Sequence, residues 1–287
     1  MYPKPLTYRR ARTLDEAFSF LSENEDARVI AGGQSIMPML KLRIASPSLL
    51  VDIAPIRELH EIRMEGNEII IGAMVTHREI IESREIKSNI PMLQETARHI
   101  ADVQIRNRGT LGGSICEADP SADYTPTLLV LDARVTLKSA KGERTVSLDD
   151  FLVGPFEVDI KQGEILTSVI IPVNRSAYSV VKYARRAADF AVASMAALVE
   201  KKTDGTVSDI RVAVGAQSDR PLRLRDLESE LTGIKPQKRD LHLAVEKAVE
   251  GLEPIDDIHG SADYRKEVTS NILKANLGSL IFGGDSK

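Results

Sequence analysis

The sequence has a single cysteine, Cys116, among its 287 residues. One thiol excludes an intrachain disulfide framework, a CxxC redox pair and a self-contained iron–sulfur site, because each of these needs more than one cysteine. If electrons pass through this protein, the metal centres that handle them therefore lie on other chains. The five histidines are scattered without an HxxxH pair, so the sequence predicts no metal site in this chain.

Tryptophan is absent and aromatic residues make up only 4% of the chain, which argues against a surface that stacks on nucleic-acid bases. The formal net charge is −4, so there is no basic excess to attract nucleic acid either. No apolar run approaches the roughly 20 residues of a membrane span, and residues Met1–Pro5 contain no apolar signal core. We therefore expect a cytoplasmic protein that binds neither nucleic acid nor a membrane.

Hydrophobic periodicity in the first fifty residues alternates between helix and strand. Thr13-Leu14-Asp15-Glu16 predicts a capping box, in which the Thr13 hydroxyl accepts from the Glu16 amide and the Glu16 carboxylate reaches back. A helix follows it. Short apolar runs at Arg28–Ala31 and Leu49–Ile53 then predict buried strands.

In the rest of the chain the pattern of predicted secondary structure changes twice. Turn residues at Gly66-Asn67 and Lys141-Gly142 lie between strand-like runs and predict two hairpins. A linker is expected near Pro172–Ser176, followed by three strand-like runs. Helices are then expected at Leu222–Leu231, Asp240–Val249 and Tyr264–Ile281. Strands followed by helices predict a separate small α+β domain, and the whole chain is predicted to be α+β.

Two glycine pairs carry the chemical signal. The first lies in Ala31-Gly32-Gly33-Gln34-Ser35, directly after a strand-like run. Glycine allows a positive φ and the close approach of a ligand. Successive amides in such a turn form an anion-binding concavity, to which the Gln34 and Ser35 side chains could add donors. A plain strand-ending turn is the alternative interpretation.

In the second pair, Gly112-Gly113, the glycines are bracketed by the hydroxyl side chains of Thr110 and Ser114, which suit phosphate oxygens. Farther on, Asp123 could accept hydrogen bonds from sugar or ribityl hydroxyls, as carboxylates do in nucleotide sites. A helix-entry loop with capping acids is the alternative. Neither segment matches GxGxxG or GxxxxGK[ST], so the sequence predicts neither a Rossmann fingerprint nor a P-loop.

Longer sequence motifs bear on the choice between a cofactor site and two plain turns, because together they resemble one family. They are Ala31–Pro38 with Lys41-Leu42-Arg43, Ile71-Gly72-Ala73 with Thr76-His77, Asp102–Gly113, Glu164-Ile165-Leu166, Lys182 with Arg185-Arg186, and Asp189-Phe190-Ala191. In this order, over nearly the whole chain, the strings resemble the medium, FAD-binding subunit of aerobic carbon monoxide dehydrogenase. They also resemble the flavin domain of the wider xanthine dehydrogenase/aldehyde oxidoreductase family. The resemblance favours a cofactor site over two plain turns.

The resemblance implies a vanillyl-alcohol-oxidase-like (PCMH-type) fold with a two-part α+β FAD-binding core. The core would cover residues 1–175, with subdomains at about 1–55 and 56–175. A small C-terminal α+β domain would cover residues 176–287. FAD is expected to lie extended between them, with no metal held by this chain.

It also implies individual cofactor contacts. The pyrophosphate would be held by the two glycine segments, and Asp123 matches an aspartate that holds the ribityl chain. Ile100 falls near the flavin ring and Leu166 near an adenine-side contact. Lys182, Asp189 and Phe190 match a stretch of the C-terminal domain near the isoalloxazine. The implied cofactor-binding set is Ala31, Gly32, Gly33, Gln34, Ser35, Ile36, Ile100, Thr110, Gly112, Gly113, Ser114, Asp123, Leu166, Lys182, Asp189 and Phe190.

The sequence departs from the family pattern at a few positions. Gln34 stands where some relatives carry His or Thr, and Ser114 where Asn is frequent, but both keep a polar donor. A carboxylate at Glu117 would repel a pyrophosphate, so we expect it to point away. Cys116 is expected to be a small buried residue without a covalent flavin attachment, and His77 to be structural.

For function, the resemblance implies the FAD-binding medium subunit of a heterotrimeric molybdenum hydroxylase, assembled as a dimer of heterotrimers. Substrate would be hydroxylated at a molybdenum cofactor on a large subunit. Electrons would cross two [2Fe-2S] clusters on a small subunit and leave through FAD on this chain to an external acceptor. No residue of this chain is predicted to be catalytic. The large subunit would select carbon monoxide, an N-heteroaromatic or, as we expect here without residue-level support, an aldehyde.

Two other functions stay open at this point. A stand-alone FAD-dependent oxidoreductase of the same fold would need its own substrate pocket with a positioned acid or base, and the sequence offers no obvious constellation. A non-enzymatic nucleotide-binding scaffold would be favoured by loss of the loop residues, yet both segments look intact. A flavin spectrum of the purified chain separates the scaffold from the other two.

Overall fold

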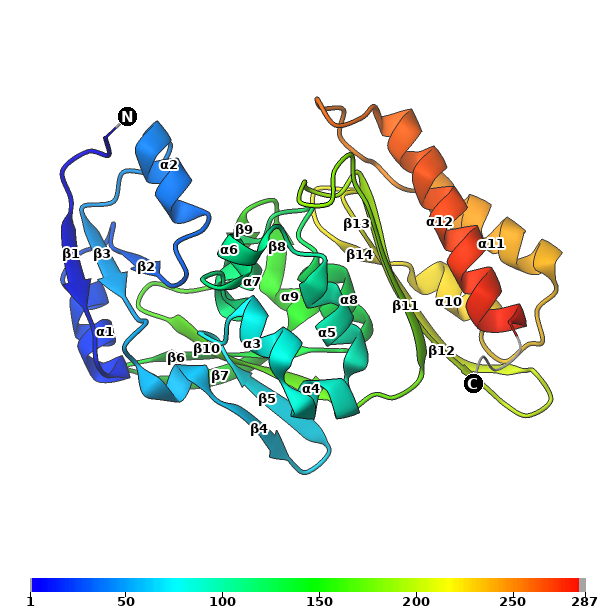
Figure 1. Cartoon of the computed structure of the whole chain (residues 1–287), viewed down its shortest axis with the longest axis horizontal. Helices are drawn as coiled ribbons and strands as arrows, with labels where there is room; N and C mark the ends of the chain where they lie inside the picture. The colour runs from blue at the N-terminus through cyan, green and yellow to red at the C-terminus, as the bar shows by residue number, and fades with distance from the viewer. Residues whose placement is uncertain (1, 284–287) are drawn as a thin grey trace. The chain divides into compact units, whose positions relative to one another are not determined.

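The computed structural model describes residues 2–283, which form a mixture of helices and sheets (Figure 1). The described residues divide into two units, each assembled from separate stretches of the chain. The first unit comprises residues 2–85, 102–118 and 133–173. The second comprises residues 86–101, 119–132 and 174–283. This mixed architecture confirms the predicted α+β class.

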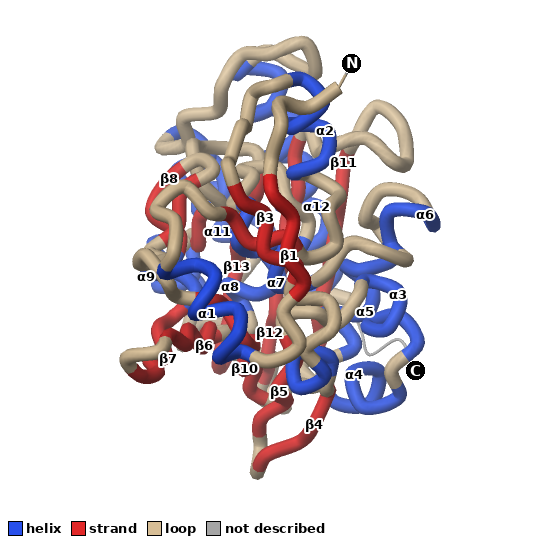
Figure 2. The backbone as a smooth tube through the Cα atoms, turned by 90° about the vertical axis from the view of Figure 1, so that its left-hand side faces the viewer, coloured by secondary structure: helices blue, strands red, loops and turns tan. Residues whose placement is uncertain are grey.

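A three-stranded parallel sheet begins the first unit, in the order β1-β3-β2. Strands β1 and β3 run side by side in Figure 2. Its strands and connecting helices are β1 (Thr7–Arg10), α1 (Leu14–Ser22), β2 (Arg28–Ile30), α2 (Ile36–Leu42) and β3 (Leu49–Asp52). At the start of α1 the Thr13 hydroxyl accepts from the Glu16 amide at 3.2 Å, as predicted. The Glu16 carboxylate, however, accepts from the amide of Arg12 at 2.8 Å, one residue before the predicted donor.

A five-stranded antiparallel sheet, in the order β4-β5-β10-β6-β7, forms the rest of the framework of the first unit. The two predicted hairpins are confirmed, since β4 pairs with β5 and β6 pairs with β7. The strands are β4 (Ile62–Glu65), β5 (Glu68–Gly72), β6 (Arg134–Ser139), β7 (Gly142–Ser147) and β10 (Ile165–Pro172). Short elements complete this unit: η1 (Arg57–His60), α3 (His77–Glu82), α6 (Val103–Arg106), α7 (Leu111–Glu117), α9 (Leu148–Phe151), β8 (Leu152–Gly154) and β9 (Glu157–Val158).

The second unit is built on a four-stranded antiparallel sheet, in the order β11-β12-β13-β14. Figure 1 shows α11 and α12 on one face of this sheet and α5 and α8 on the other. Both faces are therefore covered, which explains why β12 is buried almost throughout. The elements are α5 (Pro91–Arg98), α8 (Tyr124–Val130), β11 (Ala177–Tyr183), β12 (Ala193–Lys201), β13 (Val207–Gly215), β14 (Leu222–Arg223), α10 (Arg225–Leu231), α11 (Lys238–Glu250) and α12 (Ala262–Phe282). Helix α4 (Arg84–Asn89) precedes α5.

The helix predicted at Leu222–Leu231 is wrong at its beginning. Leu222 and Arg223 form strand β14, paired with Val214 and Ala213 of β13, and α10 starts only at Arg225. The backbone groups along the outer side of β13 need hydrogen-bond partners, and satisfying them outweighs the helical spacing of the apolar side chains.

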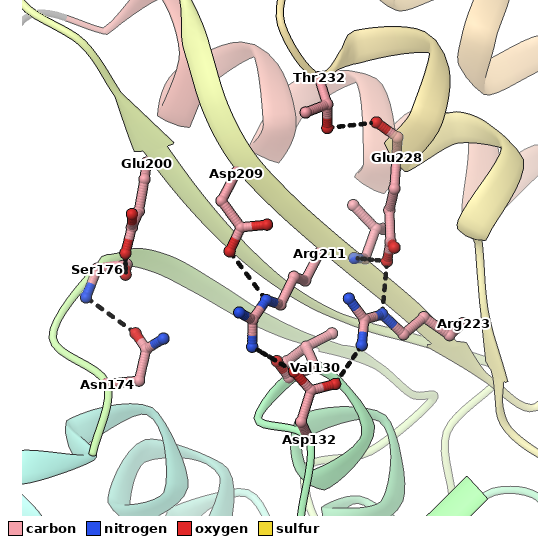
Figure 3. A network of polar contacts seen from close by, with 11 residues as sticks. Val130, Asp132, Asn174, Ser176, Glu200, Asp209, Arg211, Arg223, Glu228 and Thr232 are labelled. Atoms are coloured by element: carbon pink, nitrogen blue, oxygen red, sulfur yellow. Dashed lines mark hydrogen bonds and ion pairs between the residues drawn. The ribbon is translucent and has the colours of Figure 1, made fainter. Parts of the chain in front are cut away.

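Asp132, just after α8, lies between two arginines of this sheet (Figure 3). Arg211 Nη1 donates to Asp132 Oδ2 at 2.6 Å, and Arg223 contacts the other carboxylate oxygen. Arg223 Nε also donates to Glu228 Oε1 at 2.8 Å, an oxygen that accepts from the amide of Val212 at 2.7 Å. These partly buried pairs tie α8 and α10 to the strands, and removing one partner would leave an uncompensated charge.

Residues 86–101 and 119–132 contribute α5 and α8 to the second unit although they precede the expected linker in sequence. Among the described residues, no helix is long and apolar enough to cross a membrane.

Candidate functional site

The first glycine segment is the turn between β2 and α2. Gly33 has φ +75°, a left-handed conformation that side chains rarely adopt, so the turn requires glycine here. The Gln34 side-chain amide donates to Gly32 O at 2.8 Å, and the amide of Met37 donates to Gly33 O at 3.2 Å. Gln34 therefore braces the turn from within, where the sequence suggested that its side chain donates to a ligand.

The backbone N–H groups of residues 32–36 meet no hydrogen-bond acceptor in the part of the chain that the structure describes. Gly32 and Gly33 are half-buried, and Gln34 and Ser35 are exposed, so the turn is open on one side. A run of consecutive unpaired amides in a turn makes a concavity that suits an anion. An amide that is removed from water without an acceptor destabilises the protein, and phosphate oxygens can supply the missing acceptors.

The second glycine segment is the first turn of a helix, which corrects its interpretation as a loop. Thr110 is the N-cap of α7, and its hydroxyl accepts from the amide of Gly113 at 3.2 Å. The amides of Leu111 and Gly112 donate to Val75 O and Ala73 O, and that of Ser114 to Thr110 O. These amides are therefore occupied, and Thr110 is buried. The segment can offer a ligand the half-buried Ser114 hydroxyl and the half-buried backbone at Gly113, whereas Gly112 is buried.

The two segments pack against each other at Gly32, which lies on the backbone of Arg108 and Gly109, and at Gly113, which lies near Ala31. A Cβ added to Gly32 would lie 2.1 Å from Arg108 O and 2.9 Å from Gly109 Cα. At Gly113 it would lie 2.8 Å from Thr110 Oγ1 and 3.7 Å from Ala31 Cβ. The backbones have thus approached until only hydrogen fits between them. The unpaired amides of the first segment are held in place by this contact with the second.

Behind the second segment, His77 packs against Gly109. A Cβ on Gly109 would lie 2.5 Å from His77 Nε2, and the amide of His77 donates to Gly109 O at 3.0 Å. Burial lowers the pKa of His77 to about 4, with a further contribution from the positive charge of Arg106. The imidazole is therefore neutral at physiological pH. Its contacts are those of a packing residue, in line with the structural role expected from sequence.

Leu166 lies in β10 beside a bulge that falls between Leu166 and Ser168. Its side chain is buried in the sheet. The next residue, Thr167, accepts a hydrogen bond at its carbonyl from the amide of Ala73, whose own carbonyl accepts from Gly112. Leu166 is thus joined through backbone hydrogen bonds to the second glycine segment.

The remaining predicted residues lie in the second unit, where Asp123 and Lys182 form an ion pair at 2.9 Å. Their side chains are only 11% and 8% exposed. Lys182 Nζ also donates to His99 O at 3.0 Å, which places Ile100, the next residue, close to the pair. Burial raises the pKa of Asp123, while the ammonium of Lys182 and the nearby His99 act in the opposite direction.

One carboxylate oxygen of Asp123 lacks a hydrogen-bond partner in the described part of the chain. Asp123 Oδ1 and His99 Nδ1 are buried atoms without a hydrogen-bond partner among the described residues. A buried carboxylate oxygen that lacks a donor is destabilising, so a donor supplied from outside, such as a ligand hydroxyl, would satisfy it.

Asp189 and Phe190 lie in the connection between β11 and β12. The amide of Asp189 donates to Arg186 O at 3.1 Å, and Phe190 is exposed. The predicted set therefore falls into two groups, each brought together by the fold of its own unit. The first group is Ala31–Ile36, Thr110–Ser114 and Leu166, and the second is Ile100, Asp123, Lys182, Asp189 and Phe190.

FAD has chemistry that fits both groups, because its pyrophosphate is an anion for unpaired amides and its ribityl chain carries hydroxyl donors for Asp123 Oδ1. Cys116 lies in α7, and burial, aided by the charge of Glu117, raises its pKa to about 12. The thiol therefore stays protonated. Within residues 2–283 no three His, Cys, Asp or Glu side chains are grouped so that they could hold a metal ion.

Two protein-family models match the chain. The model of the FAD-binding domain in molybdopterin dehydrogenase covers residues 4–174, and that of the CO dehydrogenase flavoprotein C-terminal domain covers residues 176–280. The chain belongs to the family of FAD-binding medium subunits of molybdenum hydroxylases. The resemblance inferred from the sequence motifs is thereby confirmed, as is FAD as the cofactor of the family.

Members of this medium-subunit family match over nearly their full length. The glyceraldehyde dehydrogenase medium chain of Sulfolobus acidocaldarius is 38% identical over 270 residues, 93% of this chain and 95% of the relative. The carbon monoxide dehydrogenase medium chain of Hydrogenophaga pseudoflava is 34% identical over 282 residues, 97% of this chain and 98% of the relative.

Solved structures agree with this assignment. Carbon monoxide dehydrogenase from Hydrogenophaga pseudoflava superposes with a TM-score of 0.94 at 34% identity, covering 98% of each chain. Quinoline 2-oxidoreductase from Pseudomonas putida 86 superposes with a TM-score of 0.94 at 35% identity, covering 99% of each chain. The predicted fold class is therefore confirmed at the level of the whole chain.

Three features of the site had no signal in the sequence. Nothing local indicates that Gly109 must be glycine to admit His77, or that the carbonyl of His99 binds Lys182. The contact between Gly32 and Arg108 joins residues that are far apart along the chain. Their meeting depends on packing between segments, which composition and periodicity do not encode.

Proposed function

We propose that this chain is the FAD-binding medium subunit of a heterotrimeric molybdenum hydroxylase, and that it passes electrons from iron–sulfur clusters of a partner chain to an external acceptor. The observation that carries the proposal is the run of unpaired amides at residues 32–36, held against the backbone of Arg108 and Gly109 just before the second glycine segment. FAD would supply the exchange between one-electron and two-electron transfer. The residues of this chain bind and orient it.

In this proposal the amides of residues 32–36 and the Ser114 hydroxyl bind the pyrophosphate oxygens. Asp123 Oδ1 accepts from a ribityl hydroxyl, while its other oxygen stays paired with Lys182. The Lys182 ammonium opposes the rise in pKa that burial causes at Asp123, and so favours the ionised form in which both oxygens are acceptors. Residues 1–175 would form the FAD-binding domain, with subdomains at about 1–55 and 56–175. Residues 176–287 would form the C-terminal domain.

The same proposal assigns the substrate to another chain. Similar medium chains come from enzymes named for glyceraldehyde, nicotine and carbon monoxide, at 34–38% identity to this one. Because such similar flavin subunits serve such different substrates, the choice of substrate does not lie in the flavin subunit. We propose a large subunit with the molybdenum cofactor and a small subunit with two [2Fe-2S] clusters as its partners. We further propose a cytoplasmic dimer of heterotrimers.

The test begins with the purified full chain, stripped of ligand and titrated with FAD. One FAD should bind per chain and give a flavin absorption spectrum. A protein that stays colourless and refuses FAD contradicts both the subunit function and the stand-alone flavin oxidoreductase.

Purification from the native host then separates those two functions. The subunit function predicts that the chain co-purifies with a larger and a smaller partner, together with molybdenum and iron in a ratio that fits one cofactor and two clusters per heterotrimer. A flavin-containing chain that purifies alone, with its own dehydrogenase activity, would favour the stand-alone enzyme.

A further inference from the structure

Strands β11 and β12 are joined by the connection 184–192, which begins after the register pair Tyr183–Ala193. This connection carries Asp189 and Phe190, which the family resemblance places, with Lys182, in a stretch near the isoalloxazine. Its middle is open to solvent, with Phe190 58% exposed. An exposed connection of this length keeps a single conformation only where its ends are fixed.

The end of the connection is fixed at the carbonyl of Val192. Arg265 Nη1 donates to this oxygen at 2.7 Å, and the side-chain amide of Gln217 donates to it at 3.2 Å. Arg265 is only 4% exposed and Gln217 only 1%. A hydrogen bond from a buried guanidinium is among the stronger kinds available to a carbonyl, so this end is held firmly.

The beginning of the connection is fixed at Tyr183. The hydroxyls of Tyr183 and Tyr264 lie 2.9 Å apart in a hydrogen bond, and the two rings meet edge to face with centroids 6.5 Å apart. The amide of Val192 donates to Tyr183 O at 2.8 Å and closes the base of the connection. Arg185 Nη1 adds a bond to Ile258 O at 3.3 Å.

The two fixing side chains are neighbours, because Tyr264 and Arg265 both lie in the first turn of α12. Ser261 caps this turn by accepting from the amide of Tyr264. Arg265 Nη2 is in turn bound by Asp257 Oδ1 at 2.7 Å. Beside them, a Cβ added to Gly260 would lie 3.0 Å from Cδ1 of the Tyr264 ring, so the ring packs tightly against this glycine. One turn of helix thus holds both ends of the connection.

We propose that the first turn of α12 is a positioning device for the connection 184–192, with Arg265 holding its end and Tyr264 its beginning. By fixing both ends, the turn sets where Asp189 and Phe190 are presented. The effect on the flavin rests on the proposed function, whereas the clamp itself is a property of this chain alone. Arg265 and Tyr264 are positioning residues, since neither needs to touch the cofactor.

The clamp is tested first by limited trypsin digestion of the full chain without FAD, following cleavage after the exposed Arg185 and Arg186. Tyr264→Phe should raise the cleavage rate several-fold, and Arg265→Met by about tenfold or more, because opening becomes easier when a bond to a charged donor is lost. Lys274→Met is the matched control. Lys274 lies in the same helix as Tyr264 and Arg265 but far from the connection, and its replacement removes an ion pair with Glu246 of α11.

If Tyr264→Phe and Arg265→Met are cleaved no faster than Lys274→Met, the clamp does not exist. Should Arg265→Met fail to fold, Arg265→Lys keeps the charge and one of the two bonds. Arg265→Lys should then be cleaved faster than the wild-type chain. Cleavage at the wild-type rate in both Arg265→Lys and Tyr264→Phe would refute the clamp.

The effect on the flavin is measured on the FAD-loaded full chain. Tyr264→Phe and Arg265→Lys should keep the wild-type Kd for FAD but shift its midpoint potential and its visible absorption bands, while Lys274→Met changes neither. Faster cleavage with an unchanged potential and spectrum would show that the connection does not influence the flavin. If even the wild-type chain binds no FAD, the proposed function fails, and the cleavage rates still decide the clamp.

Discussion

One methyl group at Gly32 should separate the two glycine segments. A Cβ at this position would lie 2.1 Å from Arg108 O, 2.8 Å from Arg108 C and 2.9 Å from Gly109 Cα. All three atoms belong to the backbone, so no side chain can rotate away to relieve the clash. Gly32→Ala therefore forces the turn after β2 to move as a whole.

The size of the movement follows from these contacts. Cβ atoms essentially never approach closer than 3.0 Å, so the segments must part by about 1 Å. Overpacking of this kind costs about 1–3 kcal/mol. For a unit of this size, we expect the melting temperature without FAD to fall by about 3–10 °C.

The effect on FAD should be larger than the effect on folding. Amides displaced by about 1 Å leave the narrow distance range of a hydrogen bond to a phosphate oxygen. Losing two bonds to a charged acceptor, each contributing about 1.5 kcal/mol or more, raises the Kd about 100-fold. Isothermal titration with FAD and thermal unfolding of the same ligand-free sample measure the two quantities.

Gly251→Ala is the matched control for this variant. Gly251 ends α11 with φ −77°, and a Cβ there would meet nothing nearer than Ala248 O at 3.8 Å. This control should leave both the Kd and the melting temperature unchanged. If Gly32→Ala lowers the melting temperature but binds FAD with the wild-type Kd, the contact at Arg108 does not shape the cofactor site. An unchanged melting temperature would refute the packing itself.

Three further predictions concern other residues of the chain. Gly33→Asn tolerates the positive φ of its turn but adds a side chain at the amide run, so FAD affinity should fall at least tenfold by titration; Gly66→Asn, at φ +59° in an open hairpin turn, is the control and should bind normally. The folded-state pKa of His77 lies at about 4, below its value of about 6.5 in the unfolded chain, so stability should be lost as pH falls from about 6.5 to 4 and level off below that. The loss should be at most about 3 kcal/mol, measured by denaturant unfolding at each pH, and a His77→Gln variant with the same pH profile would refute it. Asp123→Leu should lower stability by about 3–5 kcal/mol because Lys182 is left as a buried unpaired charge. Adding Lys182→Met should restore the melting temperature but not FAD affinity; recovery of both would mean that Asp123 does not bind the cofactor.

Local features of the fold were predictable because the signals are local. The two hairpins follow from turn residues between strand-like runs, and the cap of α1 from Thr13 and Glu16. Strand β14 was missed because it forms by pairing with β13, a contact between distant segments. This pairing outweighs the helical spacing of apolar residues that begins at Leu222.

At the site, the sequence identifies the glycine pairs but not the structural role of each glycine. Gly32 and Gly112 lack side chains so that backbone can pack against Arg108 and Ala73, whereas Gly33 supplies a positive φ. Two adjacent glycines look alike in a string of letters. The pairing of Asp123 with Lys182 joins positions far apart along the chain. The chemistry of a carboxylate pointed to Asp123, but only the family resemblance pointed to Lys182.

The two groups of site residues imply that affinity and redox tuning can be altered separately in this chain. The first group, which we propose binds the pyrophosphate, would bind it mostly through backbone amides. An anion held by amides adds to the affinity whatever the oxidation state of a distant ring. The second group contains the buried charges of Asp123 and Lys182, and a fixed charge near a flavin ring shifts its electron affinity according to that charge. Substitutions at Gly32 or Gly33 should therefore change mainly the Kd, and those at Lys182 or in the first turn of α12 mainly the midpoint potential. A potential that follows the Kd in both groups alike would contradict this division.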